Sequence, residues 1–447
     1  MADIHPFRAF RYDPTQVSPA NAVTQPYDKI TPALQDEYYA ASPYNLVRII
    51  LGRREEADTA QTNVYSRAAG YFHDWRQKGI LRQDSQPSIY AYAQRFTLPG
   101  GKETSAKGSA ELERRGFIAL GRIEDYSASV VYRHEQTLAK PKADRLDLLR
   151  ATRGHFGQIF VLYEDSGQVE SQLVIEREPD ISVTDEYGVL HRVWQVSDPA
   201  VIASARDAMK EKKLIIADGH HRYETALAYR NERRAAGSAP VDSSTPSDSP
   251  HDFVMMTFVN MNSPALVILP THRVVHGLSS FSEESFRNSA RGFFDIDEVD
   301  PALDAARATA MLRECGRIGT CILAVTATRA FLLHHPNPNM AQVFSGLSLR
   351  QQALDVVQLH KCLLEKVLGL TEESIRNQQN LSYVRDAAEA LAQVRAESGP
   401  RANIAFLMNP CRAAQVRDVA FAGEVMPQKS TDFYPKLLSG LTIYALD

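Results

Sequence analysis

The spacing of apolar residues along the chain predicts helices and strands in alternation. Val64, Ala68, Phe72 and Trp75 share one helical face, so we expect a helix over 58–78. The same spacing recurs over 142–153 and 356–367. Short apolar runs predict strands at 44–50, 89–98, 117–120, 159–163, 213–217, 253–259, 265–269 and 403–408. We expect 253–259 and 265–269 to pair across a short turn. This mixture favours an α/β or α+β fold.

One of these strands leads into a polar turn. Asp218-Gly219-His220-His221-Arg222 follows the apolar run 213–217 and precedes a segment rich in helix formers, Tyr223–Ala235. Gly219 allows a tight turn, and a helix that begins here directs its unpaired N–H groups at the turn. Arg222 adds a planar guanidinium that fits phosphate or carboxylate oxygens. The pattern predicts an anion-binding site. The alternative is that Asp218 caps the helix and the two histidines are solvated.

The same turn offers groups for catalysis. His220 and His221 could donate hydrogen bonds near neutral pH, and Asp218 could hold a magnesium ion or accept a hydroxyl proton. A structural zinc site is not expected here, because adjacent histidines seldom converge on one ion and neither His220 nor His221 has another histidine four positions away.

Two further segments could contribute to a site. Asp28, after Pro26-Tyr27, is a candidate general base or metal ligand, or else an ordinary turn residue. Near the end of the chain, two lysines and two hydroxyl side chains could clamp a phosphate or carboxylate, although the glycines of a P-loop are missing. These four residues are Lys429, Ser430, Thr431 and Lys436. The charged run 134–145 is expected to be a solvated face.

Charge and composition narrow the class of partner. The 50 Lys and Arg residues against 54 Asp and Glu give a net charge of −4, which favours a small molecule over nucleic acid. The four cysteines form no CxxC pair, so no disulfide framework is indicated. A polar N-terminus and the lack of a membrane-length apolar run predict a cytoplasmic protein.

The strand-Asp-Gly-His-His-Arg-helix pattern resembles the ParB/sulfiredoxin-like superfamily, and its exact residues resemble the free L-serine kinases of that superfamily. Pro26-Tyr27-Asp28, His220–Ala226 and Met426–Thr431 together resemble a large bacterial domain-of-unknown-function family over nearly the whole chain. The kinase resemblance implies that Asp218, His220, His221 and Arg222 handle phosphates, metal and the substrate hydroxyl. It also implies an acidic base near the N-terminus, for which Asp28 is the candidate.

We therefore expect a ParB/sulfiredoxin-like phosphate-binding domain over 1–235, a flexible Ser/Pro-rich loop over 236–252 and an α/β domain over 253–447. The expected activity is transfer of a phosphoryl group from ATP, ADP or pyrophosphate to free L-serine, with Mg²⁺ held by Asp218. Gly219 and Arg222 would bind the phosphate. No nucleic acid or membrane partner is expected, and the chain could form a homodimer. The alternatives are a nucleotide-binding regulatory module without turnover, and a hydrolase of phosphate esters.

Overall fold

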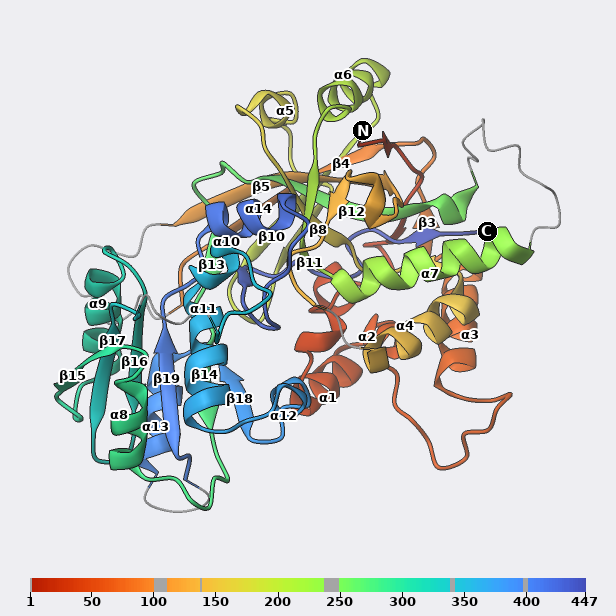
Figure 1. Ribbon diagram of the computed structural model, residues 1–447. Coiled ribbons are helices and arrows are strands. Elements are labelled where there is room, and N and C mark those ends of the chain that lie inside the picture. Colours follow the sequence, from red (N-terminus) through yellow and green to blue (C-terminus); the bar gives the residue numbers. More distant parts are fainter. Residues whose placement is uncertain (1, 100–110, 137–138, 237–248, 338–341, 397–400) are drawn as a thin grey trace. The chain divides into compact units, whose positions relative to one another are not determined.

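The protein folds into two compact units, each with its own sheet. The computed structural model describes residues 2–99, 111–136, 139–236, 249–337, 342–396 and 401–447. Unit 1 comprises 1–133, 137–267 and 435–447, and unit 2 comprises 134–136 and 268–434. Strands and helices alternate in both, so the predicted mixed α/β class is confirmed (Figure 1). None of the described helices has both the length and the apolar character needed to cross a bilayer.

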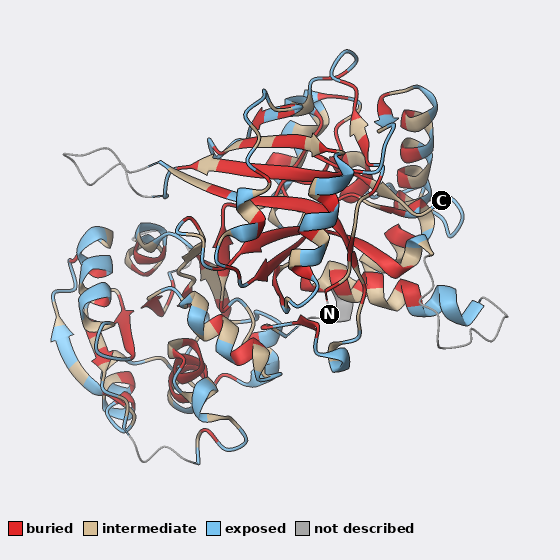
Figure 2. Cartoon of the chain, turned by 90° about the horizontal axis from the view of Figure 1, so that it is seen from above, coloured by how far each residue is buried: buried red, intermediate tan, exposed pale blue. Residues whose placement is uncertain are grey.

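Unit 1 is built on a nine-stranded mixed sheet. Its strands follow the order β6-β11-β8-β12-β5-β4-β10-β9, and β1 (Ile4–His5) pairs with β5. The central strand β8 (Ile159–Tyr163) is buried at all five positions, which explains why its sequence is a continuous apolar run. The strong burial of the sheet is visible in Figure 2. The other strands are β4 (Ile89–Phe96), β5 (Leu112–Arg122), β6 (Val131–Tyr132), β9 (Ile181–Thr184), β10 (Leu190–Val196), β11 (Leu214–Asp218) and β12 (Phe253–Asn260).

Three long helices of unit 1 pack side by side. Helix α4 (Ala139–Thr152) contacts both α3 (Val64–Gln77) and α7 (His220–Ala236). The predicted face of α3 is the buried one, with Val64, Ala68, Phe72 and Trp75 inside. The shorter helices are α1 (Pro32–Ala41), α2 (Val47–Ile50), α5 (Gln168–Ser171) and α6 (Pro199–Met209), and the small strand pairs are β2 (Phe10–Tyr12) with β3 (Leu81–Gln83) and β7 (Gly154–His155) with β21 (Tyr444–Ala445).

Unit 2 has a six-stranded antiparallel sheet in the order β15-β17-β16-β19-β14-β18. The predicted helix at 356–367 exists, but its second part, Leu359–Val367, has π-helical hydrogen bonding. The strands are β14 (His272–Val275), β15 (Asp295–Val299), β16 (Cys321–Val325), β17 (Ala330–His334), β18 (Leu381–Val384) and β19 (Ile404–Met408). The helices are α8 (Glu283–Ala290), α9 (Ala305–Cys315), α10 (Leu349–Gln352), α11 (Asp355–Gln358), α12 (Glu372–Arg376), α13 (Ala387–Arg395) and α14 (Ala413–Phe421).

The predicted strand at 44–50 is wrong, because Val47–Ile50 forms helix α2. The Asn45 side chain accepts a hydrogen bond from the Val47 N–H at 2.9 Å and so starts the helical turn. All but one of the four helical residues are buried. A short run that is apolar on every side fits a buried helix as well as a strand, so the pattern alone was ambiguous.

The predicted pairing of 253–259 with 265–269 is also wrong. Strand β12 lies between β8 and β5, and β13 (Val267–Leu269) pairs with β20 (Asp432–Tyr434). All eight residues of β12 are buried, so both of its edges need a partner strand. Its last residue, Asn260, donates a side-chain hydrogen bond to the Asp165 carbonyl at 2.9 Å, which fastens this end beside β8.

The observed boundaries between the two units differ from those predicted at 235 and 252. Helix α7 continues to Ala236, residues 237–248 of the expected loop lie outside the described residues, and β12 belongs to the unit 1 sheet. The chain passes into unit 2 after Val267 and returns to unit 1 at Pro435. The Ser/Pro-rich stretch therefore lies within the sequence of unit 1 and does not separate the units.

Candidate anion-binding turn in unit 1

The Asp218–Arg222 motif forms the expected turn between β11 and α7. The register of β11 against β8 shifts between Ile216 and Asp218, and such an irregularity re-aims the side chain that follows it. Gly219 has φ +94°, a conformation that glycine adopts without steric cost. Helix α7 then starts at His220. The local sequence thus places Asp218 at the very end of the strand, before the helix.

Asp218 is a carboxylate surrounded by basic groups. Its Oδ1 accepts the Gly219 N–H at 2.8 Å, and its Oδ2 lies 3.4 Å from Lys436 Nζ. Burial raises the pKa of Asp218, but the charges of Lys436, Arg222 and Lys29 outweigh it, and the pKa lies below its ordinary value. Asp218 is therefore ionised at physiological pH, which suits a metal ligand or hydrogen-bond acceptor better than a general base.

Arg222 is fixed by the backbone around it. Its Nη1 donates to the Gln158 carbonyl, and its guanidinium lies against Gly219 and Gly157. A Cβ added at Gly219 would stand 2.9 Å from Arg222 Nη2, and one at Gly157 would stand 3.1 Å from Nη1. Both glycines thus leave the space that the guanidinium occupies. The contact of Arg222 with Gln158 joins residues 64 positions apart, which no local pattern connects.

The two histidines differ in exposure. His220 is buried at 8% exposure, whereas His221 is half-buried, and the His221 carbonyl accepts the Thr225 hydroxyl at 2.7 Å. His220 also contributes to the low pKa of Asp218. The reading in which both histidines are solvated therefore does not hold for His220.

The N-terminal segment contributes Tyr27 and Lys29 to the surroundings of the Asp218 turn. Asp28 is exposed on the short 3-10 helix Tyr27–Lys29. Burial, followed by the charge of Asp28, raises the pKa of Tyr27, while Arg145 and Arg222 oppose the rise. The guanidinium of Arg145 lies over the Tyr27 ring, 4.2 Å from its centroid. Sequence reasoning selected Asp28 here and missed Lys29, whose charge acts directly on Asp218.

A small cavity of about 70 Å³ opens beside Arg222. Its lining includes Tyr27, Gly157, Thr225 and Ser439, together with apolar residues of α4. Next to Gly157, Gln158 is fully buried, and its amide nitrogen and oxygen have no hydrogen-bond partner among the described residues. A buried amide without a hydrogen-bond partner lowers the free energy of unfolding by about 1–3 kcal/mol. Such unpaired groups often have a functional role.

The residues fit a magnesium ion only together with a phosphate. Among the described residues, no three His, Cys, Asp or Glu side chains converge at this turn as a metal site would require. Protein-bound Mg²⁺ commonly uses one or two carboxylates and completes its shell with water and substrate phosphates. Asp218 can be such a carboxylate, and the basic groups around it would hold the phosphates.

The four residues predicted near the end of the chain lie in different units. Lys436 belongs to unit 1, where its carbonyl accepts the Gln94 side chain at 2.8 Å and its ammonium faces Asp218. The other three belong to unit 2. There, the Ser430 hydroxyl donates to the Pro427 carbonyl at 2.6 Å, Thr431 Oγ1 lies 2.7 Å from His134 Nε2, and Lys429 is exposed with φ +58°. Ser430 and Thr431 thus help to hold their own loop.

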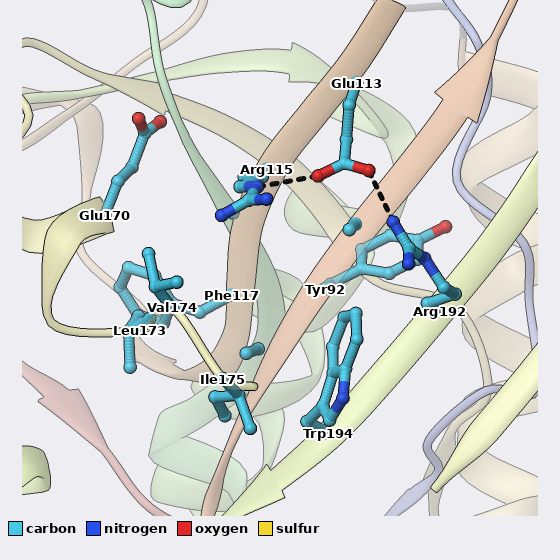
Figure 3. Close-up of a pocket in the computed structure, with 13 residues that line it drawn as sticks. Tyr92, Glu113, Arg115, Phe117, Glu170, Leu173, Val174, Ile175, Arg192 and Trp194 are labelled. Atoms are coloured by element: carbon cyan, nitrogen blue, oxygen red, sulfur yellow. Dashed lines mark hydrogen bonds and ion pairs between the residues drawn. The ribbon is translucent and has the colours of Figure 1, made fainter. Parts of the chain in front are cut away.

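A second pocket of unit 1 lies over β4, β5 and β10, and its cations are already paired (Figure 3). Glu113 accepts Arg115 Nε at 2.7 Å on one oxygen and Arg192 on the other. The Trp194 N–H donates to the Arg177 carbonyl at 2.8 Å. Two carboxylates, Glu113 and Glu170, balance the two arginines in this lining. This pocket therefore attracts an anion less strongly than the Asp218 turn, where three cations share one carboxylate.

The fold and the turn define a mixed α/β protein with a candidate anion-binding site. Residues 4–357 match the family described as "Protein of unknown function (DUF1015)", so the chain belongs to the DUF1015 family. This confirms the predicted relationship to a family of that kind, whereas the ParB/sulfiredoxin-like placement stays a prediction. A search of curated proteins found no match.

Three solved structures show distant similarity. A conserved hypothetical protein from Pyrococcus furiosus is 11% identical over 68% of this chain and 87% of its own, with a TM-score of 0.33. A free serine kinase in complex with AMP is 12% identical over 70% and 89%, with a TM-score of 0.35. SbnI from Staphylococcus aureus, truncated at its C-terminus, is 10% identical over 72% and 85%, with a TM-score of 0.33. Similarity at this level transfers neither substrate nor activity.

Proposed function

We propose that this protein is a small-molecule kinase that transfers a phosphoryl group from ATP, ADP or pyrophosphate to the hydroxyl of free L-serine. The observation that carries the proposal is the turn between β11 and α7, where Asp218 is held among Lys436, Arg222 and Lys29. Phosphoryl transfer requires little covalent chemistry from a protein. It requires cations around the moving group, a carboxylate for the metal and precise positioning.

Each group of the turn has a distinct role in this proposal. Arg222, braced against Gly157 and Gly219, presents a fixed guanidinium to phosphate oxygens. Lys436 and Lys29 add positive charge, and the helix start at His220 adds backbone N–H donors. When bound, Mg²⁺ supplies charge neutralisation between the phosphates, and ionised Asp218 is its protein ligand.

The base that accepts the serine proton is a separate group, because ionised Asp218 has little proton affinity near neutral pH. We assign this role to Asp28, which lies in the same short helix as Lys29. His220 and His221 would donate hydrogen bonds to the transferring group. The orphaned amide of Gln158, one residue from the cavity lining, supports a polar ligand in this region.

The test is direct detection of the product. Purified protein is incubated with Mg²⁺, L-serine and, separately, ATP, ADP or pyrophosphate, and O-phosphoserine is measured by mass spectrometry. We expect product with at least one donor. Asp218→Asn and Lys436→Ala should each lower the rate by about 100-fold or more, because the first weakens the proposed Mg²⁺ ligand and the second removes positive charge that stabilises the transition state.

An ion pair on the surface provides the matched control. Lys210 and Asp207 lie 2.6 Å apart with exposed side chains, and neither lines the cavity beside Arg222 or the pocket over β4, β5 and β10. Asp207→Asn and Lys210→Ala therefore change the same residue types outside both. Both should retain full activity. Nucleotide binding without product would indicate a regulatory module, and phosphate release without serine would indicate a hydrolase. Wild-type rates in both turn variants would rule out the turn as the catalytic site.

A further inference from the structure

A second cluster of chemically active side chains lies at the edge of the unit 2 sheet. Strand β15 forms this edge and pairs with β17, so that Asp295 stands opposite His334 (Figure 1). His335 follows directly after β17. Among the described residues, Asp295, His334 and His335 form a group whose ligand atoms all lie within 4.8 Å of one another.

The distances within the cluster match those between ligands of one metal ion. His334 Nδ1 lies 2.9 Å from His335 Nδ1, and His335 Nδ1 lies 3.5 Å from an Asp295 oxygen. Zinc binds histidine nitrogen at about 2.0–2.1 Å, so two ligands at 90–109° around the ion stand about 2.9–3.3 Å apart. The two imidazole nitrogens are within hydrogen-bond distance of each other, and their separation is also the one that a shared ion would impose.

A fourth residue orients one of these ligands. His334 Nε2 lies 2.9 Å from an Asp297 carboxylate oxygen. In the neutral His334 imidazole, a proton on Nε2 would donate to this carboxylate and leave the Nδ1 lone pair directed towards His335. A carboxylate that fixes the far nitrogen of a metal-bound histidine is a common feature of metal sites and raises the affinity of the ligand. Asp297 is thus a positioning residue.

The backbone also holds His335 in an unusual conformation. Its φ is +44°, in the left-handed region that few residues other than glycine adopt. This conformation turns the strand end so that His335 meets His334. Non-glycine residues in such conformations cluster at functional sites, where other interactions hold them in place.

A simpler explanation is that charged residues protect an exposed sheet edge from pairing with another chain. That role requires charge on β15, which Asp295, Asp297 and Glu298 provide. It does not require the convergence of two imidazole nitrogens and one carboxylate oxygen from two strands. It also does not explain why the second carboxylate lies on the far nitrogen of His334.

We propose that Asp295, His334 and His335 form a binding site for a divalent transition-metal ion, with Zn²⁺ as the representative ion and Asp297 as the support of His334. Two nitrogens and one oxygen suit Zn²⁺, Ni²⁺ or Cu²⁺, whereas Mg²⁺ and Ca²⁺ prefer oxygen ligands alone. With three protein ligands at an exposed edge, the remaining positions on the ion would belong to water. This site lies outside unit 1 and is independent of the proposed kinase activity.

The experiment is calorimetric titration of zinc chloride into the full chain, without an affinity tag and after removal of metals with a chelator. We expect saturable binding that includes one site lost in His335→Ala and in Asp295→Asn, with at least a tenfold loss of affinity in each. Asp297→Asn should weaken the same site by 10- to 100-fold, as removal of such supporting carboxylates does elsewhere. Magnesium chloride should give no heat from this site.

Two substitutions on other surfaces serve as controls. His73 is exposed on α3, and Asp418 is exposed on α14 with Arg417 beside it, so His73→Ala and Asp418→Asn remove the same residue types elsewhere. Both should bind zinc as the wild type does. Asp295 and His335 are mostly exposed, and thermal unfolding without metal should confirm that their variants remain folded. Absent binding, or undiminished binding in both site variants, would overturn the proposal.

Discussion

At the scale of single residues, the candidate site depends on the absence of a Cβ at Gly219. Its φ of +94° is accessible to glycine, and the absence of a Cβ lets the Arg222 guanidinium lie over the turn. Gly167 has almost the same φ, +97°, but a Cβ there would meet no atom within 4 Å. The two glycines therefore separate the effect of backbone strain from the displacement of Arg222.

We expect Gly167→Ala to lower the free energy of unfolding by about 1–2 kcal/mol, because it forces alanine into a left-handed conformation. Gly219→Ala should lower it by at least as much, because its Cβ also displaces Arg222. Only Gly219→Ala should weaken the binding of pyrophosphate, by about tenfold or more, since its Cβ pushes the guanidinium aside. Thermal unfolding and calorimetric titration would measure the two effects. Equal pyrophosphate affinity in both variants would show that Arg222 does not bind the anion.

At the scale of elements, strand β14 shows how a buried position changes the chemistry of a side chain. His272 is 3% exposed between β18 and β19, and its Nδ1 accepts the Met408 N–H at 3.1 Å. The predicted strand in this region ends at Leu269, so the sequence placed His272 outside any predicted strand. The structure places His272 inside the sheet instead, where burial and then the charge of Arg273 lower its pKa to about 4.

This lowered pKa makes the stability of unit 2 depend on pH. Between pH 6.5 and 4 the unfolded chain binds a proton at His272 that the folded chain does not, so the unfolding free energy falls as the pH falls. The loss over this window is about 3 kcal/mol, from 1.36 kcal/mol per pKa unit. His272→Asn keeps an acceptor for Met408 but does not titrate.

Urea unfolding of the wild type and His272→Asn at several pH values would measure this contribution. We expect the two proteins to converge as the pH falls from 6.5 to 4, because only the wild type loses the histidine contribution. His73→Asn, at an exposed position on α3, should follow the wild type. Parallel curves for wild type and His272→Asn would contradict the assignment.

At the scale of the whole molecule, unit 1 is completed by the last part of the chain. Residues 435–447 return to it, and the Gly440 N–H donates to the Phe156 carbonyl at 3.0 Å. Ser439 forms a two-way backbone bridge with Thr24. Leu437, Leu438, Leu441 and Ile443 are all buried. This segment therefore supplies both core contacts and the lysine that faces Asp218.

We expect Leu441→Ala to destabilise unit 1 by about 2–5 kcal/mol, because it removes a fully buried side chain and leaves a cavity. Hydrogen exchange measured by mass spectrometry should show faster exchange in peptides of β8 and β12, with unit 2 peptides unchanged. Leu349→Ala, at a position 83% exposed, is the control and should change neither unit. Uniform destabilisation of both units would mean that they unfold together.

Several features could be predicted from the sequence because they depend on residues that are close together along the chain. The helical spacing of Val64, Ala68, Phe72 and Trp75 required one buried face, and that face is buried. The strand, glycine turn and helix around Asp218 follow from residues next to one another, so the turn was predicted correctly. The mixed α/β class follows from the sum of such local preferences.

Only the tertiary structure decided which distant residues meet. The pairing of β12 with β8 and β5, the return of 435–447 to unit 1, and the positions of Lys29, Lys436 and Gln158 near the turn join segments separated by many residues. Whether 44–50 became strand or helix was decided by the burial of three of the four residues of α2. Long-range contacts of this kind arise from packing and hydrogen-bond satisfaction over the whole chain, and no local period of the sequence encodes them.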